Sequence, residues 1–346
     1  MNEELQVKRY EPHEFADLLA FSSQLPFETT LIHERFVNYY YTTSNFCYLY
    51  TLRNQKKDII GSVGIEKMQF QYRDKPIILA NGSNLNVITK GVGHGKILFT
   101  KWLEEGDFGI VFGGSPDTHN ILQKQEWDYF DGANLMYYNK PVKIYVTDPV
   151  WKRAIVNILR LIPGPSLNSS INKISHTFPE FNKLRTIECD YSDIELPNKS
   201  PFDFHFNPSK EYLKWRYNTH LDFVNYRLFR IEDFNGMQVG YVIINLKPGI
   251  AMVAHVDGTD PKKLALGTIK CLECLRDIIE NSIVFLASSH IKMQKIFFRF
   301  GFKLSRLDRK LAIGAIKKPT NIDQNTSNWI INFDWGDNGL RLPFLV

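Results

Sequence analysis

The sequence is poor in cysteine, has no block of positive charge and has no apolar run of membrane-spanning length. Four cysteines in 346 residues are too few for a disulfide framework, which favours a reducing compartment. The formal charge of +5 is spread along the chain, and no basic block indicates a nucleic-acid partner. A membrane helix needs roughly 20 apolar residues in a row, and the acidic N-terminus lacks the apolar core of a signal peptide. These absences predict a cytoplasmic protein with no membrane span and no nucleic-acid partner.

Apolar residues are instead plentiful, and their spacing is that of a mixed α/β protein. Hydrophobic residues make up 44% and aromatic residues 14% of the sequence, enough for the cores of two ordinary domains. Up to residue 140, helices are predicted at 13–22, 30–40, 97–105 and 117–130, and strands at 46–52, 59–69, 76–79, 85–89, 108–112 and 136–138. An Asn81-Gly82 pair predicts a turn between the third and fourth of these strands.

The rest of the chain divides into a connecting segment and a second part with the same order of elements. Residues 141–204 form the connection, with a basic amphipathic helix predicted at 151–162 and a Pro- and Gly-rich linker at 163–170. Beyond it, helices are predicted at 212–217, 262–281 and 291–300, and strands at 225–232, 238–245, 250–256 and 283–287. The repeated order predicts one domain at residues 1–140 and another at 205–346, although the halves share little sequence.

A glycine-rich stretch, Lys90-Gly91-Val92-Gly93-His94-Gly95, joins the predicted strand 85–89 to the helix that follows it. Glycine permits a tight turn and lets a ligand approach the main chain closely, and the first N–H groups of a helix attract an anion. The stretch therefore predicts a cradle for a phosphate. A Rossmann dinucleotide site fits poorly, because several strands precede the turn. His94 either donates to the phosphate or is an exposed loop residue.

In these residues the chain resembles the GNAT superfamily of acetyl-CoA-dependent N-acyltransferases, in its tandem two-domain form. The family's signature is Arg/Gln-x-x-Gly-x-Gly/Ala at the start of the helix after the fourth strand, and Lys90-x-x-Gly93-x-Gly95 is similar to it, with lysine as the cation. Asn120 and Trp127 follow a buried strand in the family's order, with Trp127 where tyrosine is usual. The resemblance implies an α/β (α+β) fold of two GNAT-like domains, each a mostly antiparallel sheet flanked by helices.

The resemblance also implies acetyl-CoA as the acyl donor and no metal. The glycine stretch would bind its pyrophosphate, and a main-chain N–H group of the preceding strand would polarise the thioester carbonyl. Asn120 would hydrogen-bond the pantetheine arm, with a role as a helix cap as the alternative. The implied donor-binding residues are Leu85, Asn86, Val87, Lys90, Gly91, Val92, Gly93, His94, Gly95, Lys96 and Asn120.

Acylation of an amine needs a base for the amine and an acid for the leaving thiolate. Trp127 cannot serve as that acid, so Tyr129 is the nearest phenol, although on a helix it would point to a different face. Its alternative role is packing. Glu66, on a predicted strand, either faces the substrate cleft as the base or is solvated at the surface. Tyr129 and Glu66 are the predicted catalytic residues.

The second half lacks the glycine signature. Asp257 and Asp260 precede its long helix and would repel a pyrophosphate, so we expect a domain that kept the fold and lost donor binding. Cys271 and Cys274, three residues apart on a predicted helix, are expected in the core, because a structural zinc usually has four ligands.

The sequence thus predicts an N-acetyltransferase that transfers an acyl group from acyl-CoA to a small amine, with an amino sugar suggested as acceptor. Two alternatives stay open. One is a GNAT-fold protein that binds CoA or serves as a scaffold without catalysis. The other is a FemAB-like aminoacyl transferase, which takes its donor from aminoacyl-tRNA. The residues also leave the oligomeric state open, a homodimer included.

Overall fold

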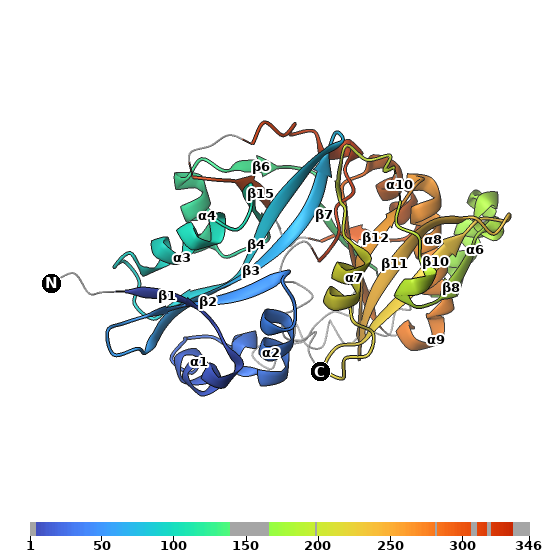
Figure 1. Cartoon of the computed structure of the whole chain (residues 1–346). Helices are drawn as coiled ribbons and strands as arrows, with labels where there is room; N and C mark the ends of the chain where they lie inside the picture. The colour runs from blue at the N-terminus through green and yellow to red at the C-terminus, as the bar shows by residue number, and fades with distance from the viewer. Residues whose placement is uncertain are drawn as a thin grey trace, which may run out of the picture.

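The computed structural model describes residues 5–138, 166–197, 199–280, 282–305, 310–316 and 320–334. Two sheets lie side by side, each with helices packed against it (Figure 1). The first sheet has the order β1 (Gln6–Arg9), β2 (Cys47–Arg53), β3 (Ile59–Tyr72), β4 (Lys75–Val87), β5 (Phe108–Phe112), β15 (Leu311–Gly314) and β6 (Asp128–Phe130), with β9 (Phe204–Phe206) also paired to β3. The second has the order β14 (Lys303–Leu304), β7 (Asn134–Tyr138), β13 (Ile283–Ser288), β12 (Ile250–Gly258), β11 (Gln238–Lys247), β10 (Tyr226–Glu232) and β8 (Arg185–Glu188).

The helices cover the sheets and close three apolar cores. In the first domain they are α1 (Phe15–Ser22), α2 (Glu34–Thr42), α3 (His94–Leu103) and α4 (Pro116–Lys124). Further along the chain lie α6 (Leu167–Thr177), α7 (Lys210–Arg216), α8 (Pro261–Cys274), α9 (Arg276–Ile279) and α10 (Ile291–Phe300). In Figure 1, α1 and α2 lie below the first sheet, and α3 and α4 cover its other face. One core lies between α3 and the first sheet, one between α1, α2 and the facing second domain, and one under α8 and α10.

Among the described residues most strand pairs are antiparallel, and each sheet contains one parallel pair. In the first sheet this pair is β4 with β5, and in the second it is β12 with β13. Parallel neighbours need a crossover connection, which α3 and α8 supply. The predicted fold class, two mixed sheets with flanking helices, is therefore confirmed.

The two sheets exchange a strand. β7, which precedes the second half in sequence, pairs with β13 and β14 in the second sheet. β15, from near the end of the chain, pairs with β5 and β6 in the first sheet. The connecting residues are also divided, because β8 joins the second sheet and β9 joins the first. Each sheet is thus completed by a strand from the other half of the chain.

The turn predicted at Asn81-Gly82 is wrong, because both residues lie inside β4. The strand runs unbroken from Lys75 to Val87 and pairs with β3 along its length. A side chain at Gly82 would meet the Trp102 ring of α3 at 2.5 Å. Glycine is needed here because a helix packs closely on the strand, not because the chain reverses.

The helix predicted at 117–130 is also shorter than expected. α4 ends at Lys124, and Glu126 adopts a φ of 60°, which a right-handed helix cannot accommodate. Tyr129 therefore lies in β6, paired with Ala312 of β15.

Three further sequence predictions concern the second half. The helix expected at 262–281 is interrupted after Cys274, where α8 ends and the short α9 follows. α6 begins within the expected linker 163–170, because the Ser166 hydroxyl caps it by accepting from the Ser169 N–H group at 3.1 Å. The helix predicted at 151–162 lies outside the described residues.

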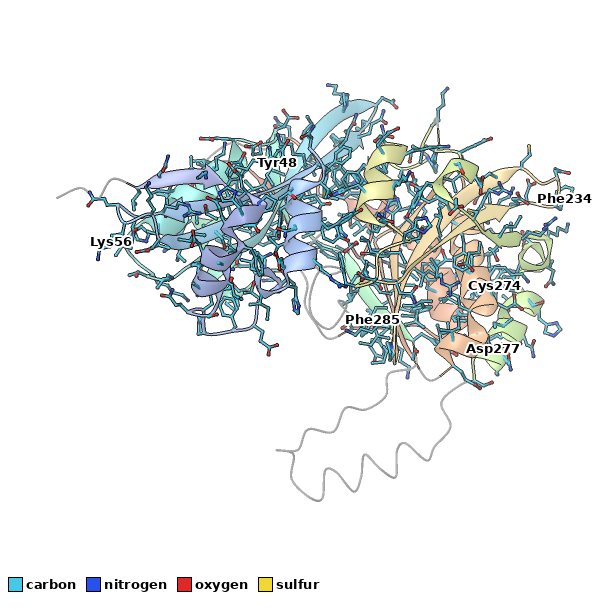
Figure 2. All side chains as sticks on the ribbon, turned by 60° about the horizontal axis from the view of Figure 1, so that its bottom comes forward. Tyr48, Lys56, Phe234, Cys274, Asp277 and Phe285 are labelled. Atoms are coloured by element: carbon cyan, nitrogen blue, oxygen red, sulfur yellow. The ribbon has the colours of Figure 1, made fainter. Side chains whose placement is uncertain are left out.

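The pair Cys271 and Cys274 divides between core and surface. Cys271 is buried, whereas Cys274, labelled in Figure 2, is exposed, so the expectation of two core cysteines is wrong for Cys274. Among the described residues, no three His, Cys, Asp or Glu side chains gather as a metal site would require. None of the helices described is both long and apolar enough to traverse a bilayer.

Candidate functional site

β4 and β5 separate partway along their length and leave a main-chain edge without a partner strand. They pair over three positions, Leu79 with Phe108, Ala80 with Gly109 and Asn81 with Ile110. In the described structure, residues 82–87 pair with β3 on one side and with no strand on the other. We call this stretch the open edge of β4. Its main-chain groups can hydrogen-bond a ligand as they would a neighbouring strand.

A bulge in β4 shapes the open edge. The register between β3 and β4 shifts between Ser62 and Gly64, and Asn84 adopts a left-handed φ of 49°. The Asn84 side chain is held at both ends. Its oxygen accepts from the Thr29 hydroxyl at 3.0 Å, and its amide donates to the Thr30 and Tyr41 hydroxyls at 3.2 and 3.0 Å. The chain before α2 therefore fixes the direction of the open edge.

The glycine turn follows the open edge and ends at the N-terminus of α3. Gly91 and Gly93 adopt φ values of 86° and 89°, which favour glycine. A Cβ added at Gly91, Gly93 or Gly95 would meet no atom of the described residues within 4 Å. Nothing in this part of the chain therefore requires glycine at Gly95. Gly93 is the N-cap residue of α3. Because glycine has no side chain, the first N–H groups of the helix have no side-chain cap.

The polar groups around the glycine turn suit a phosphate. Lys90 Nζ lies 2.8 Å from Asp117 Oδ2 of α4, an exposed ion pair that lowers the pKa of Asp117. His94 is half-buried, and within the described residues its Nδ1 atom has no hydrogen-bond partner. Lys96 and Val92 are exposed on the same turn. A cation and the first N–H groups of a helix thus border open space, an arrangement that can attract an anion.

α4 and β6 bring together a histidine and a tyrosine beside β15. Ser115 caps α4 by accepting from Thr118 N at 3.1 Å, so Asn120 is not the cap and lies exposed on the helix. His119 Nδ1 lies 3.0 Å from the Tyr129 hydroxyl. Burial raises the pKa of Tyr129, so the phenol keeps its proton at neutral pH. Sequence reasoning missed His119. Its partner, Tyr129, was predicted to lie on the same helix, whereas in the structure it lies on β6.

Trp127 is part of the core. Its indole packs so closely on two neighbouring strands that a Cβ at Gly109 or Gly314 would approach it to 2.4 and 2.6 Å. It also packs against Phe99 and Trp102 of α3. The position at which the family usually has tyrosine is therefore occupied here by a side chain that joins α3 to the sheet.

Glu66 lies at the fork between β4 and β5 but faces the second domain. It is 3% exposed, so it is not solvated at the surface. Its carboxylate accepts hydrogen bonds from Asn81 at 3.4 Å, from Arg216 Nε at 3.0 Å and from the Tyr212 hydroxyl. The structure does not bring Glu66 and Tyr129 together, because Tyr129 packs against the α3 core on the other face of the sheet.

Arg216 carries this cluster into the second domain. Its Nη2 atom lies 3.0 Å from Asp334 Oδ2, and its Nη1 atom donates to the Tyr226 hydroxyl at 3.4 Å. Glu66, Arg216 and Asp334 are each almost fully buried. We call these three side chains the ion triad. It joins the fork of the first sheet to the end of the described chain.

Comparison with known proteins shows the fold. No protein-family model and no curated protein matches the sequence. Among solved structures, a GCN5-related N-acetyltransferase from Anabaena variabilis matches with a TM-score of 0.55 at 11% identity, over 91% of this chain and 73% of that one. A GCN5-related N-acetyltransferase from Kribbella flavida matches with a TM-score of 0.55 at 11% identity, over 90% and 71% of the two chains. A glucosamine N-acetyltransferase region of a fungal multi-domain β-N-acetylglucosaminidase matches with a TM-score of 0.53 at 10% identity, over 90% and 38%.

At these identities the likeness concerns the fold. In each sheet of the described structure, two strands pair in parallel at only three positions and then diverge. The chain thus carries the GCN5-related N-acetyltransferase (GNAT) fold twice, in tandem.

Proposed function

We propose that the first domain binds an acyl-CoA along the open edge of β4 and transfers the acyl group to an amine of a small acceptor. One observation carries the proposal. The open edge runs directly into a glycine turn whose space no side chain of the described residues fills, at the uncapped N-terminus of α3. A strand edge suits the amide-rich pantetheine arm, and a helix N-terminus suits its pyrophosphate.

The residues of the turn have distinct roles in this proposal. The N–H groups at the start of α3 would meet the pyrophosphate, with the His94 side chain as a further donor and Lys96 adding charge. Lys90 would leave Asp117 for the phosphate, which costs little because the ion pair is exposed. Leu85, Asn86 and Val87 would present main-chain groups to the pantetheine arm and the thioester.

An acyl-CoA supplies a thioester, whose carbonyl carbon forms a bond to the amine nitrogen while its carbon–sulfur bond breaks. The amine loses a proton to water, and the thiolate gains one from an acid. We propose Tyr129 as the proton donor for the thiolate. Its raised pKa keeps it protonated, and its bond to His119 Nδ1 orients the hydroxyl. Asn120 is exposed on α4, the helix that carries His119, and would hydrogen-bond the pantetheine arm.

Glu66 acts in this proposal as a positioning residue. Arg216 and Tyr212 already occupy its carboxylate, and it holds Asn81, the last residue of β4 that pairs with β5.

An amino sugar is the proposed acceptor. One of the structural neighbours is a glucosamine N-acetyltransferase region.

Calorimetric titration of acetyl-CoA tests the donor site with a matched pair of variants. Gly93 and Gly236 have φ values of 89° and 77°, and a Cβ at either position meets no described atom within 4 Å. Leucine therefore imposes the same backbone strain at both positions, but only Gly93→Leu fills the proposed cradle. We expect micromolar binding to the wild type and to Gly236→Leu, and loss of at least about tenfold in affinity in Gly93→Leu.

A wild-type protein that does not bind acetyl-CoA would refute the donor site, as would two variants that bind equally well. Binding of aminoacyl-tRNA in place of acetyl-CoA would favour a FemAB-like transferase. Release of CoA thiol with a panel of amines that includes glucosamine then tests the transfer. A protein that binds acetyl-CoA and releases no thiol with any amine would favour the scaffold alternative.

A further inference from the structure

The second sheet contains a strand gap built like the one in the first. β12 and β13 pair in parallel at Ile250 with Ile283, Ala251 with Val284 and Met252 with Phe285. β12 continues to Gly258 and β13 to Ser288, but among the described residues the two strands pair no further. β12 therefore has its own open edge at residues 253–258.

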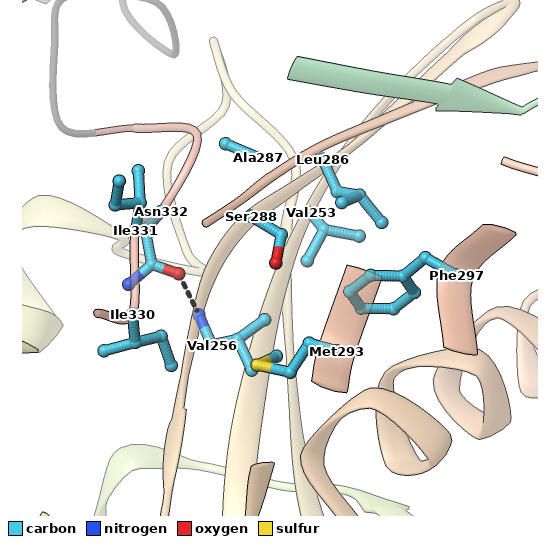
Figure 3. Close-up of a pocket in the computed structure, with 10 residues that line it drawn as sticks. All are labelled: Val253, Val256, Leu286, Ala287, Ser288, Met293, Phe297, Ile330, Ile331 and Asn332. Atoms are coloured by element: carbon cyan, nitrogen blue, oxygen red, sulfur yellow. Dashed lines mark hydrogen bonds between the residues drawn. The ribbon is translucent and has the colours of Figure 1, made fainter. Parts of the chain in front are cut away.

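Residues 329–334 of the same chain fill this gap. The Val256 N–H group donates to Asn332 Oδ1 at 2.9 Å (Figure 3), and the Asp334 N–H group donates to the Ala254 carbonyl at 3.3 Å. On the opposite side, the Ser289 hydroxyl donates to the Trp329 carbonyl at 2.9 Å. The segment thus contacts both the open edge of β12 and the chain that follows β13, as a ligand between separated strands would.

The side chains of this segment alternate between two cores. Ile330 packs into the core under α8 and α10, and it lines a small pocket with Met293 and Phe297 of α10 (Figure 3). Ile331 and Phe333 point into the core that faces the first domain. All three are at most 3% exposed. The gap is therefore closed by apolar packing as well as by hydrogen bonds.

The helix after this gap differs from α3 at its N-terminus. Asp260 caps α8, and its carboxylate accepts from the N–H groups of Lys262 and Lys263 at 2.8 and 3.0 Å. In α3 no side chain caps the first N–H groups, whereas in α8 two of them are already paired with a negative charge. A phosphate at this position would meet that charge instead of free donors.

We propose that residues 329–334 are an internal ligand of the second domain, lying where the first domain would hold the pantetheine arm of an acyl-CoA. One chain then binds a single acyl-CoA, and its second domain holds a segment of the chain itself. The comparison of the two gaps rests on the proposed function of the first domain. The contacts of the segment with β12 do not depend on that function.

Two measurements on the full chain test this inference. Calorimetry should give one acetyl-CoA per chain. Hydrogen–deuterium exchange resolved to the Val256 amide should show protection in the wild type, which Asn332→Ala lowers roughly three- to tenfold. Asn325→Ala is the matched control, because Asn325 is exposed and caps only the turn at 326–328. It should leave exchange at Val256 unchanged.

The outcomes separate the two proposals. Two acetyl-CoA molecules per chain, or exchange at Val256 as fast in the wild type as in Asn332→Ala, would overturn the internal ligand and leave the first donor site standing. No acetyl-CoA binding would overturn the proposed function, while slow exchange at Val256 that Asn332→Ala alone accelerates would still support the internal ligand. The exchange measurement does not depend on catalysis.

Discussion

Replacement of Arg216 by methionine should destabilise the whole protein strongly. Methionine fills a similar volume and carries no charge, so the change removes the centre of the ion triad, together with the 3.4 Å hydrogen bond from Arg216 to the Tyr226 hydroxyl. Arg216 Nε lies 3.0 Å from Glu66, and Arg216 Nη2 lies 3.0 Å from Asp334. The three side chains are at most 4% exposed. Water therefore cannot replace the lost partner.

Removal of one partner from a buried ion pair costs about 3–5 kcal/mol, because the remaining charge stays desolvated. Arg216→Met leaves two carboxylates in this state, and they face each other across the space of the lost guanidinium. We therefore expect a loss of at least about 3–5 kcal/mol in the free energy of unfolding. For a protein of ordinary stability, about 5–15 kcal/mol, this is a large fraction of the total.

Urea denaturation followed by tryptophan fluorescence measures the loss. The control is a charge-balanced variant, Arg216→Met with Glu66→Gln and Asp334→Asn, which should recover most of the stability because no buried charge stays unpaired. A loss below about 1 kcal/mol in Arg216→Met would show that water reaches the triad. A balanced variant no more stable than Arg216→Met would show that shape, and not charge, determines the effect.

Three further predictions concern single sites. Burial raises the pKa of Asp257 to about 7, so the folded protein keeps a proton that the unfolded chain loses above about pH 4. The free energy of unfolding should therefore fall by up to about 1.4 kcal/mol per unit as pH rises through this window, and Asp257→Asn should remove that fall. Burial also lowers the pKa of His255 to about 3, which makes the free energy of unfolding rise with pH. The decisive result is therefore the difference between the urea curves of the wild type and Asp257→Asn, and not the wild-type curve alone. Gly82→Ala should cost about 1–3 kcal/mol in a thermal melt, because its Cβ would lie 2.5 Å from Trp102. An unchanged melt would contradict that packing. Tyr129→Phe should lower kcat about 100-fold or more without weakening acetyl-CoA binding, whereas a normal kcat would exclude Tyr129 as the proton donor.

The sequence predicted the elements whose local signals are strong. The glycine turn, the strand at 108–112 and the helix at 291–300 all depend on nearest neighbours, and the last two agree with the structure at both ends. Asn81-Gly82 misled, because a turn signal cannot report that Trp102 packs on Gly82 from another element. Glu126 likewise ends a helix through a backbone conformation that its residue type rarely adopts.

Long-range contacts in the site were beyond local reasoning. Glu66 was noted as a carboxylate on a strand, but its environment comes from Arg216, 150 residues further along the chain. The pairing of His119 with Tyr129 depends on the strand β6, which forms because β15 lies beside it. The position of the segment that fills the second gap could not be predicted locally, because it depends on the strand edge that the segment covers.

The exchange of β7 and β15 also affects the order in which the protein can fold during synthesis. β5 leaves the ribosome with its outer edge bare, and its neighbour β15 emerges about 200 residues later. At ~5–20 residues per second, that delay is roughly 10 to 40 s. For this period an apolar strand edge is exposed to other nascent chains, and such edges pair readily with the wrong partner. The first domain is therefore begun early and completed only after β15 is made, and its yield in a cell should depend on whatever shields that edge until then.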